Sequence, residues 1–413
     1  MHVAIIGGGI GGLSTALYLH QQGIDCCVYE SVPEYKPLGV GINLFPHAMR
    51  RLFELGLEAG VREVGVEARE FTFFNQHGQL IYREPCGRHA GYDWPHFSFH
   101  RADLHRVLLD AVIARLGPDA VRNGHRCSGF SQDDQGVTLQ FHTGTTSHAV
   151  RADVAIACDG FHSAIRRQLY PDEAPAHFGG INLWRGVTRG APFLSGASVT
   201  RCGALRHGKL VVYPIRNHAD GTQTINWAVE ILKSDWSEND WNKSGQLSDF
   251  IDYFSERRFP WLDIPRLFRE AEFILEYPMV DRDPIPRWSF GRVTLLGDAA
   301  HPMYPRGGNG GAQSILDAEL LASLLANCHD PVQALQAYEA ERRPKTRDIV
   351  LTNRSTPPDA IIERVDALTA SQPFDRIEDV ISLGELQGMS ESYKQVTSMD
   401  RAAVNLVHHG IHQ

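Results

Sequence analysis

Residues 2–12 read His-Val-Ala-Ile-Ile-Gly-Gly-Gly-Ile-Gly-Gly, and an alanine- and leucine-rich stretch follows them. This order predicts an apolar strand, a G-x-G-x-x-G turn and a helix. Glycines in such a turn let the backbone approach a pyrophosphate, whose charge meets the free N–H groups and the positive dipole end of the helix. The first unit of the chain is therefore typical of a dinucleotide-binding βα fold.

A second apolar run supports this prediction. It extends from Asp25 to Tyr29 and ends in Glu30, eighteen residues after Gly12. An acid at about this spacing accepts hydrogen bonds from the ribose hydroxyls of a bound dinucleotide. A tight turn without a ligand would explain the glycines alone, but it would not explain the strand, the helix and the acid together.

The composition points to small-molecule partners. The chain has 413 residues, 43% of them apolar and 22% charged, with a formal net charge of −9. This length predicts two domains or one large interleaved domain. The acidic balance gives no electrostatic reason to bind nucleic acid or an anionic membrane. Seven cysteines without a C-x-x-C pair, and scattered histidines, indicate reduced structural thiols and no metal site. With no charged leader and no apolar stretch of spanning length, the sequence predicts a cytoplasmic protein.

The hydrophobic pattern predicts an α/β organisation that is interrupted by a β-rich region. Helical spacing covers residues 46–60 and 101–116, a hairpin is expected at 71–74 and 80–83, and strands are expected at 137–141 and 154–158. Short β-rich segments at 183–187, 210–215 and 224–232 predict an antiparallel sheet. A strand at 292–296 and helices at 313–326 and 331–352 return to the α/β pattern, and a helix-biased tail ends the chain.

Two further turns follow buried strands. The run Val154 to Cys158 ends in Asp159-Gly160, which taken alone is as consistent with an ordinary turn as with a binding edge. The run Val293 to Leu296 ends in Gly297-Asp298, and Ala-Ala-His-Pro and the glycine-rich residues 305–312 follow it. This aspartate can accept from a sugar-alcohol hydroxyl. The glycine-rich stretch exposes N–H donors at a helix start, where they can reach the carbonyl groups of a ring such as a reduced flavin.

The order of these motifs resembles the single-component FAD-dependent aromatic hydroxylases, a family that includes p-hydroxybenzoate, 3-hydroxybenzoate and salicylate hydroxylases. The resemblance covers about residues 1–350. Within the family, the runs at residues 37–43, 184–187 and 277–284 are most similar to the monooxygenases that act on 5-methylphenazine-1-carboxylate.

The resemblance implies an α/β fold with a Rossmann-like FAD-binding domain, an interleaved antiparallel β-sheet substrate domain and C-terminal helices. The FAD-binding domain would be built from residues 1–75, 101–175 and 281–352, with a substrate-domain hairpin at 76–100, a β-rich substrate domain at 176–280 and a helical tail at 353–413. The tail is interpreted as a packing or dimer-facing appendage, so that a homodimer is one hypothesis.

Carried over residue by residue, the resemblance also implies a set of cofactor contacts. The FAD pyrophosphate would be bound by Gly7, Gly9, Gly11 and Gly12, and the adenosine ribose by Glu30. Arg101 would lie along the phosphate or ribityl portion, and Cys127 would make a main-chain contact near adenine. Asp159 with Gly160 would serve both FAD and a transient nicotinamide nucleotide. Asp298 beside Gly297 would hold the ribityl hydroxyls. The isoalloxazine would be approached by Pro305, Gly310 and Gly311. Many relatives carry an arginine shortly after the ribose acid, whereas the nearest base here is Lys36.

The reaction implied is hydroxylation of an aromatic or heteroaromatic compound, phenolic or carboxylated. NADH or NADPH would reduce the FAD, and O2 would form a flavin C4a-hydroperoxide, which needs a dry pocket. Candidate pocket walls are Trp184, Leu210, Val212, Tyr213, Trp227, Val229, Met303, Tyr304 and Pro305. Tyr213, Tyr304 and His207 are candidates for polarising the substrate, and Arg185 for holding a carboxylate through two hydrogen bonds. His301 is expected to pack behind the Gly-Asp turn.

Two other classes of protein stay open as alternatives. One is a different flavoenzyme, such as an oxidase or a halogenase; the halogenases carry a Trp-x-Trp-x-x-Ile string that this sequence lacks. The other is a non-enzymatic binding or escort protein that no longer uses flavin. Such a protein would be expected to lose the Gly-Asp motif, which is intact here.

Overall fold

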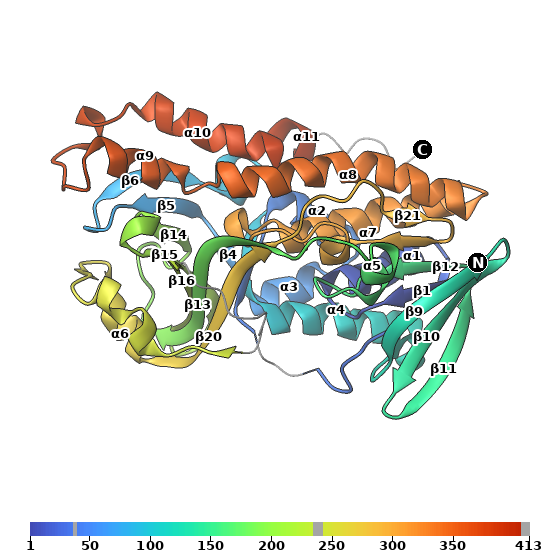
Figure 1. The fold of residues 1–413 in the computed structure, drawn as a ribbon. Helices are drawn as coiled ribbons and strands as arrows, with labels where there is room; N and C mark the ends of the chain where they lie inside the picture. Colours follow the sequence, from blue (N-terminus) through green and yellow to red (C-terminus); the bar gives the residue numbers. More distant parts are fainter. Residues whose placement is uncertain (36–38, 234–242, 406–413) are drawn as a thin grey trace.

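A parallel sheet forms the centre of the computed structural model, which describes residues 1–35, 39–233 and 243–405 (Figure 1). The strand order is β21 (Ser289–Phe290), β22 (Val293–Leu295), β12 (Val154–Ala157), β1 (His2–Ile6), β2 (Asp25–Tyr29) and β8 (Val121–Arg122), with only β21 antiparallel to its neighbour. Because β1 pairs in parallel with both β2 and β12, the carboxyl ends of these three strands meet at one edge. Open α/β sheets bind ligands at this edge. The predicted α/β fold class is confirmed.

Different layers cover the two faces of this sheet. Helices α1 (Ile10–Gln21), α4 (Arg101–Leu116) and α7 (Gly310–Asn327) pack together on one face, and α8 (Pro331–Ser355) packs on α7. A three-stranded antiparallel sheet of β9 (Arg126–Asp133), β10 (Gly136–Thr143) and β11 (Thr146–Ala152) covers the other face, at the lower right of Figure 1. Tyr29 of β2 stacks on Phe141 of β10, with 4.6 Å between the ring centroids.

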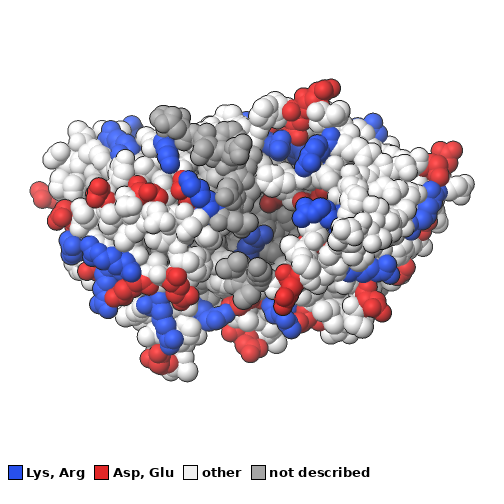
Figure 2. Space-filling view, turned by 60° about the horizontal axis from the view of Figure 1, so that its bottom comes forward, with Lys and Arg blue, Asp and Glu red and all other residues white. Residues whose placement is uncertain are grey.

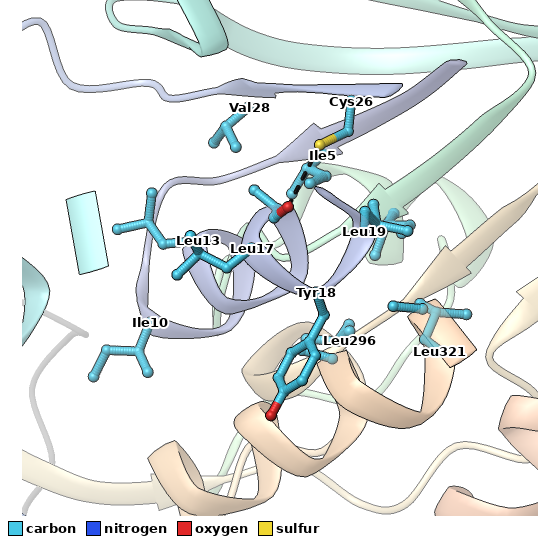
Figure 3. Close-up of a cluster of buried hydrophobic side chains, with 14 of the residues drawn as sticks. Ile5, Ile10, Leu13, Leu17, Tyr18, Leu19, Cys26, Val28, Leu296 and Leu321 are labelled. Atoms are coloured by element: carbon cyan, nitrogen blue, oxygen red, sulfur yellow. Dashed lines mark hydrogen bonds between the residues drawn. The ribbon is translucent and has the colours of Figure 1, made fainter. Parts of the chain in front are cut away.

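The first helix is buried between the sheet and α7. Figure 3 shows Ile5 and Val28 on the strand side of α1 and Leu321 on the α7 side. A Cβ on Gly11 would lie 3.1 Å from Cδ2 of Leu296 and 3.2 Å from Cβ of Ser314. Gly11 therefore allows α1 to lie close against the residues around the start of α7.

An eight-stranded sheet forms the second large layer. Its order is β17 (Lys243–Ser244), β20 (Ala271–Asp281), β13 (His177–Gly190), β16 (Gln223–Leu232), β15 (Lys209–Asn217), β14 (Ser198–Cys202), β5 (Glu70–Phe74) and β6 (Leu80–Pro85). The pairs are antiparallel, as predicted for residues 181–232, except that β14 pairs in parallel with β5. The predicted hairpin of β5 and β6 is confirmed and forms one edge of this sheet. The division of the chain into domains stays a prediction.

A small sheet joins the two layers. Its strands are β3 (Gly41–Leu44), β7 (His96–His100) and β4 (Gly65–Ala68). All three strands contact β15 of the large sheet, and β3 also contacts α7. The strand β3 is therefore shared by the large sheet and the helical layer.

The helix predicted at residues 46–60 is wrong in its extent. The structure has two helices there, α2 (Pro46–Glu54) and α3 (Glu58–Val64). Gly56 has a φ of 70°, and its N–H donates to the carbonyl oxygen of Phe53 (2.8 Å), so α2 ends in a left-handed turn. The leucines that suggested one continuous helix, Leu52, Leu55 and Leu57, are all buried, but across a helix end.

The predicted helical tail is confirmed over the described residues. It consists of α9 (Ala360–Leu368), α10 (Leu383–Val396) and α11 (Arg401–Asn405), while residues 406–413 lie outside the described part. Figure 1 shows α9 and α10 above the β5–β6 hairpin, with α11 beyond the end of α10. Ile361 and Val365 of α9 and Leu386 of α10 form a buried cluster with Phe73 and Ile81 of the hairpin. The tail is therefore a packing element of the large sheet.

The surface carries both signs of charge. On the face shown in Figure 2, basic and acidic side chains are interspersed over the molecule. Among the residues that the structure describes, no helix is long and apolar enough to cross a membrane.

Candidate active site

Close contacts that only glycine allows shape the turn between β1 and α1. Gly7 has a φ of 100°, and a Cβ on it would lie 2.4 Å from the carbonyl oxygen of Cys158. A Cβ on Gly12 would lie 2.0 Å from the carbonyl oxygen of Gly7. Gly9 differs, because a Cβ there would meet no atom within 4 Å. Gly9 borders the start of α1, which has no side-chain cap and no acidic residue in its first turn. The first N–H groups of α1 are therefore available to a phosphate.

Glu30 lies against this turn at the end of β2. Its Oε2 accepts the N–H of Gly8 (2.7 Å), and its Oε1 accepts the N–H of Val32 (2.8 Å) and the hydroxyl of Ser31 (3.0 Å). An ionised carboxylate offers about four acceptor positions, so Glu30 can still accept from a ligand hydroxyl. Its location beside the glycine turn fits the predicted ribose contact.

Two aromatic side chains flank the same turn. The hydroxyl of Tyr35 donates to the carbonyl oxygen of Gly8 (3.4 Å), and Nε2 of His105 lies 2.7 Å from that oxygen. The two rings are 4.4 Å apart between centroids. Arg101 begins α4, one turn before His105, and its side chain is exposed. Lys36, the base noted in place of the family's arginine, lies outside the described residues.

The turn after β12 contains an unsatisfied acceptor. Oδ2 of Asp159 accepts the N–H of Ala164 (2.8 Å) at the start of α5 (Ala164–Leu169), whereas its Oδ1 is buried without a hydrogen-bond partner among the described residues. Burial raises the pKa of Asp159. A Cβ on the neighbouring Gly160, whose φ is 75°, would meet nothing within 4 Å. Because buried acceptors are nearly always paired, Oδ1 fits a ligand hydroxyl as its donor. Burial, with a smaller contribution from the charge of Asp159, raises the pKa of Cys127 in β9 to about 11.

The third turn, Gly297–Ala299, carries Asp298 close to the start of α7. Asp298 is exposed, and its Oδ1 lies 3.7 Å from the position of a Cβ on Gly310, the first residue of α7. Arg166 of α5 connects this turn to the previous one, since its Nη1 donates to the carbonyl oxygens of Ala299 (2.9 Å) and Ala300 (3.1 Å). The Asp159 and Asp298 turns are therefore held together by one buried guanidinium.

A buried network supports the third turn from behind. Asp317 of α7 is hydrogen-bonded to Nε2 of His301 (2.6 Å), accepts the N–H of Gly297 (3.2 Å) and accepts from Nε of Arg342 (2.6 Å). Burial opposes ionisation of Asp317, but Arg342 and His301 outweigh it and hold the pKa below its ordinary value. His301 is 3% exposed and packs behind the turn, as expected.

The glycine-rich loop before α7 brings the helix against β3. The flavin loop, residues 305–309, is named for the isoalloxazine contact that the resemblance implies; it starts at the exposed Pro305 and contains Gly307 and Gly308 with φ of 74° and 68°. The start of α7 has no side-chain cap. A Cβ on Gly311 would lie 2.9 Å from Cδ1 of Ile42, so the N-terminus of α7 touches β3.

Tyr213 and Arg185 reach β3 from the large sheet. A Cβ on Gly41 would lie 2.6 Å from Cε2 of Tyr213, and Oδ1 of Asn226 accepts the N–H of Gly41 (2.6 Å). Nη2 of Arg185 donates to the carbonyl oxygen of Gly41 (2.8 Å). Burial raises the pKa of Tyr213, although Arg185, which is hydrogen-bonded to it, opposes the shift. Arg185 thus contacts β3 through Nη2, whereas its Nε is buried without a hydrogen-bond partner among the described residues.

The other two candidate residues for polarising the substrate lie elsewhere. Tyr304 is buried, its hydroxyl is 2.5 Å from Nδ1 of His177, and burial raises its pKa to about 12. His207 contacts the tail, with its Nε2 3.0 Å from the hydroxyl of Ser371 and 3.5 Å from Oδ1 of Asp366. His207 ends the turn Leu205–His207 before β15, whereas Tyr213 lies four residues, about 13 Å of extended chain, beyond the first residue of that strand. The structure does not bring His207 together with Tyr213.

Most of the predicted pocket walls point away from β3, which corrects that expectation. Trp184, Leu210, Val212, Trp227 and Val229 belong to the core on the outer face of the large sheet. The layer outside this core contains α6 (Ile264–Arg269), β18 (Arg258–Phe259) and β19 (Leu262–Asp263). Side chains alternate along a strand, so Tyr213 faces the opposite side from Val212. The alternation of side chains along β15 would have distinguished the residues that face β3 from those that face the outer core.

Three buried charged residues near the site were missed from the sequence. Arg166 is 2% exposed, Asp317 is 0% exposed and Arg201 is 8% exposed. A charged residue is rarely buried unless it is paired or bound. The available signal for Arg201 was its position as the one charged residue in the strand Ser198–Cys202.

Comparisons with known proteins agree with this geometry. The model of the FAD binding domain family matches residues 1–242 and 278–352, and so ends before α9. A phenazine 1,6-dicarboxylic acid hydroxylase from Lysobacter antibioticus is 44% identical over 411 residues, which are 97% of this chain and 98% of the relative. A 3-amino-4-hydroxybenzoate 2-monooxygenase from Streptomyces platensis is 33% identical over 84% of this chain and 85% of its own length. The structure of HpxO from Klebsiella pneumoniae complexed with FAD and uric acid is similar with a TM-score of 0.72 and 25% identity, covering 98% of this chain and 96% of that one.

The chain belongs to the FAD-binding-domain family. It is an FAD-dependent monooxygenase with the fold of the aromatic hydroxylases. The residues fit this cofactor, because the space in front of Gly9, the uncapped starts of α1 and α7 and the unpaired Oδ1 of Asp159 all lie at one end of the parallel sheet.

Proposed function

We propose that this monooxygenase uses NADH or NADPH and O2 to hydroxylate a carboxylated heteroaromatic compound, and that phenazine carboxylates are the first class to test. The near full-length similarity to a phenazine 1,6-dicarboxylic acid hydroxylase supports this class. Bound FAD, once reduced by the nicotinamide nucleotide, would activate O2 for transfer of one oxygen atom to the substrate. The residues of the chain bind and orient the reactants and exclude water from them.

The observation that carries the proposal is the shared wall at β3. Gly41 of β3 packs under Tyr213 of the large sheet, and the next residue, Ile42, touches Gly311 at the start of α7. FAD bound along Gly9, Asp298 and Gly310 would place its ring end near this wall. A substrate on the inner face of the large sheet would then lie next to the ring, among buried residues that exclude water.

The cofactor contacts follow from the same geometry. In this proposal the ribose hydroxyls donate to Glu30, the first turn of α1 receives the pyrophosphate, and Asp298 accepts from the ribityl hydroxyls. Oδ1 of Asp159 accepts one further ligand hydroxyl. The N–H groups of Gly310 and Gly311 at the start of α7 donate to the ring.

The two buried tyrosines are orienting groups in this proposal. Burial raises the pKa of Tyr213 and of Tyr304, so both phenols are protonated at neutral pH. A protonated phenol donates or accepts a hydrogen bond but is not a ready base. Tyr213, which packs on β3, is the better placed of the two to orient a substrate ring.

A cleft beside the Asp159 turn supports a docking place for the nicotinamide nucleotide. It has a volume of about 250 Å³, and its lining includes Phe161, His162, Arg167 and Arg282. The guanidinium of Arg282 lies 5.0 Å from the centroid of the Phe161 ring. Basic and aromatic side chains in one cleft suit a nucleotide that carries phosphates and flat rings.

Replacing the cleft arginine Arg167→Gln tests this docking place. We expect the KM for NADH or NADPH to rise about 5- to 10-fold, since one charge-assisted hydrogen bond is lost, while FAD content and the affinity for the aromatic compound stay unchanged. Arg167 is exposed, so the fold should tolerate the change. Arg269→Gln, at an exposed position of α6, is the matched control. Equal KM values for the two variants would remove the cleft from the proposal.

The proposed function itself is tested by anaerobic reduction of the bound flavin. NADH or NADPH is added with and without phenazine carboxylates, hydroxybenzoates, salicylate and hydroxyquinolines, and loss of the flavin absorbance is followed. We expect one carboxylated heteroaromatic compound to accelerate bleaching strongly and to be recovered as a hydroxylated product in air. Bleaching that no compound accelerates, with hydrogen peroxide as the only product, would instead indicate an oxidase.

A further inference from the structure

A small cavity lies between the flavin loop, the large sheet and the C-terminal helices. Its volume is about 40 Å³. Phe45, Phe71, Phe73 and Met399 form its apolar wall, and Arg201 and Lys394 are its basic residues. Met399 and Lys394 belong to the segment beyond residue 352, where the family model ends.

Arg201 is a buried guanidinium with donors to spare. It is 8% exposed, and its Cζ lies over the rings of Phe71 (5.6 Å) and Phe73 (5.5 Å). Its ion-pair partner among the described residues is Asp359, whose Oδ1 is 3.9 Å from Nε, beyond hydrogen-bond distance. Asp359 is itself paired with Lys209. A guanidinium has five N–H donors, so most of those of Arg201 are free to bind a ligand in the cavity.

The cavity is built against the flavin loop. A Cβ on Gly307 would clash with the hydroxyl of Tyr393 in α10. That hydroxyl accepts from Nδ2 of Asn309 (2.9 Å) and donates to Oδ1 of Asn353 (2.8 Å). Phe45 also touches Gly308, with its Cε2 3.7 Å from the position of a Cβ there. A group bound by Arg201 would therefore lie beside the loop that leads to the proposed ring end of FAD.

The acids that line or flank the cavity are each paired with a base. Lys394 pairs with Glu84 (2.9 Å) and with Glu391 (2.8 Å), and the carboxylates raise its pKa although burial opposes the shift. Glu84, the acid that lines the cavity, is thus neutralised by Lys394 and also accepts from the hydroxyl of Ser390 (2.8 Å). Arg201 shares the Asp359 carboxylate with Lys209, which also pairs with Glu230 (2.7 Å), and lies 3.9 Å from it, so its own N–H donors stay open to a second acceptor.

We propose that Arg201, with Lys394 from α10, binds a carboxylate of the aromatic substrate, so that the C-terminal segment takes part in substrate recognition. This inference rests on the proposed function. A carboxylate matches the fork of a guanidinium with two parallel hydrogen bonds. A volume of about 40 Å³ holds two or three water-sized groups, which suits a carboxylate but not a tricyclic ring. The ring therefore lies outside this cavity, toward the flavin loop.

The proposal is tested with two ligands that differ only in their carboxylate groups. Phenazine-1,6-dicarboxylate and unsubstituted phenazine are titrated into the FAD-loaded protein, and the dissociation constants are read from the change in flavin absorbance. We expect Arg201→Gln to weaken the dicarboxylate about 10- to 100-fold and to change phenazine by less than about twofold. Arg201→Lys, which keeps the charge but loses the fork, should fall between these values.

The control is Arg189→Gln on the same sheet, because Arg189 is exposed and paired with Asp220 (2.7 Å). Both affinities should stay at the wild-type values. If Arg201→Gln does not retain FAD, Lys394→Met at the cavity rim carries the test, with an expected loss of about 3- to 10-fold for the dicarboxylate alone. Variants that bind the two ligands as the wild type does, or that weaken both equally, overturn the carboxylate site while leaving the proposed function intact. A wild-type protein that binds neither ligand overturns both.

Discussion

Gly9→Val should give a folded protein that holds no FAD. Gly9 has φ −75° and ψ −174°, which any residue adopts, and a Cβ there would meet no protein atom within 4 Å. The valine would instead fill the space in front of α1, where the pyrophosphate is proposed to bind. We expect the affinity for FAD to fall at least about 100-fold, measured by the flavin absorbance of the purified protein and by titration of the apoprotein.

The same experiment distinguishes a binding defect from a folding defect. The circular dichroism and the thermal midpoint of the apoprotein should match those of the wild-type apoprotein. Gly384→Val in α10 is the control, since a Cβ at that position also meets no atom within 4 Å and lies far along the chain from the turn. A Gly9→Val protein that binds FAD as the wild type does would contradict the assignment of this turn to the pyrophosphate.

Asp317→Asn should cause the largest loss of stability. Asp317 is fully buried, and its charge is balanced by Arg342, which is 4% exposed. Removal of the charge leaves the buried guanidinium uncompensated, which typically costs about 3–5 kcal/mol. The N–H of Gly297 also loses a charged acceptor, so the Asp298 turn should loosen and FAD should bind more weakly. Denaturant unfolding of the apoprotein and FAD titration measure the two effects separately.

The direction of the pKa shift of Asp317 determines how the stability loss of Asp317→Asn depends on pH. Because the pKa of Asp317 is held below its ordinary value, the carboxylate stabilises the fold above the unfolded pKa, near 4, and this contribution is lost as the pH falls through the folded pKa. The stability gap between wild type and Asp317→Asn should therefore be full at pH 7 and shrink in strong acid. Asp348→Asn, at an exposed position of α8, should change stability by less than about 0.5 kcal/mol at any pH. A gap that is constant with pH would show that the charge is not what stabilises the turn.

The first βα unit could be predicted from local sequence pattern alone. The strand at residues 2–6, the glycine turn, the helix and the acid at Glu30 were all predicted and all occur. Each depends on neighbours in sequence, because a period of two, a period of 3.6 and a need for positive φ are local properties. The wrong helix prediction at residues 46–60 also came from local pattern, since the pattern of buried leucines continues past Gly56 although the helix ends before it.

The placement of the catalytic candidates could not be predicted from local sequence pattern. Tyr213, Arg185 and His207 looked equivalent as polar residues in β-rich sequence, but the structure joins the first two at Gly41 and puts His207 under the tail. Which face of a strand meets a ligand depends on what packs against it, and that partner, β3, is far away in sequence.

The sequence by itself determined the class of fold, the three turns that are proposed to bind the cofactor and the helical tail, because the signals for strands, turns and helices lie in consecutive residues. Only the tertiary structure decided that Gly11 serves the packing of α1 on α7, that five predicted pocket walls belong to an outer core, and that the tail closes a cavity around Arg201. These features arise from contacts between segments that are distant in the sequence, such as Trp227 with Phe268 and Gly11 with Ser314. Their energies come from burial and charge pairing, which no local pattern encodes.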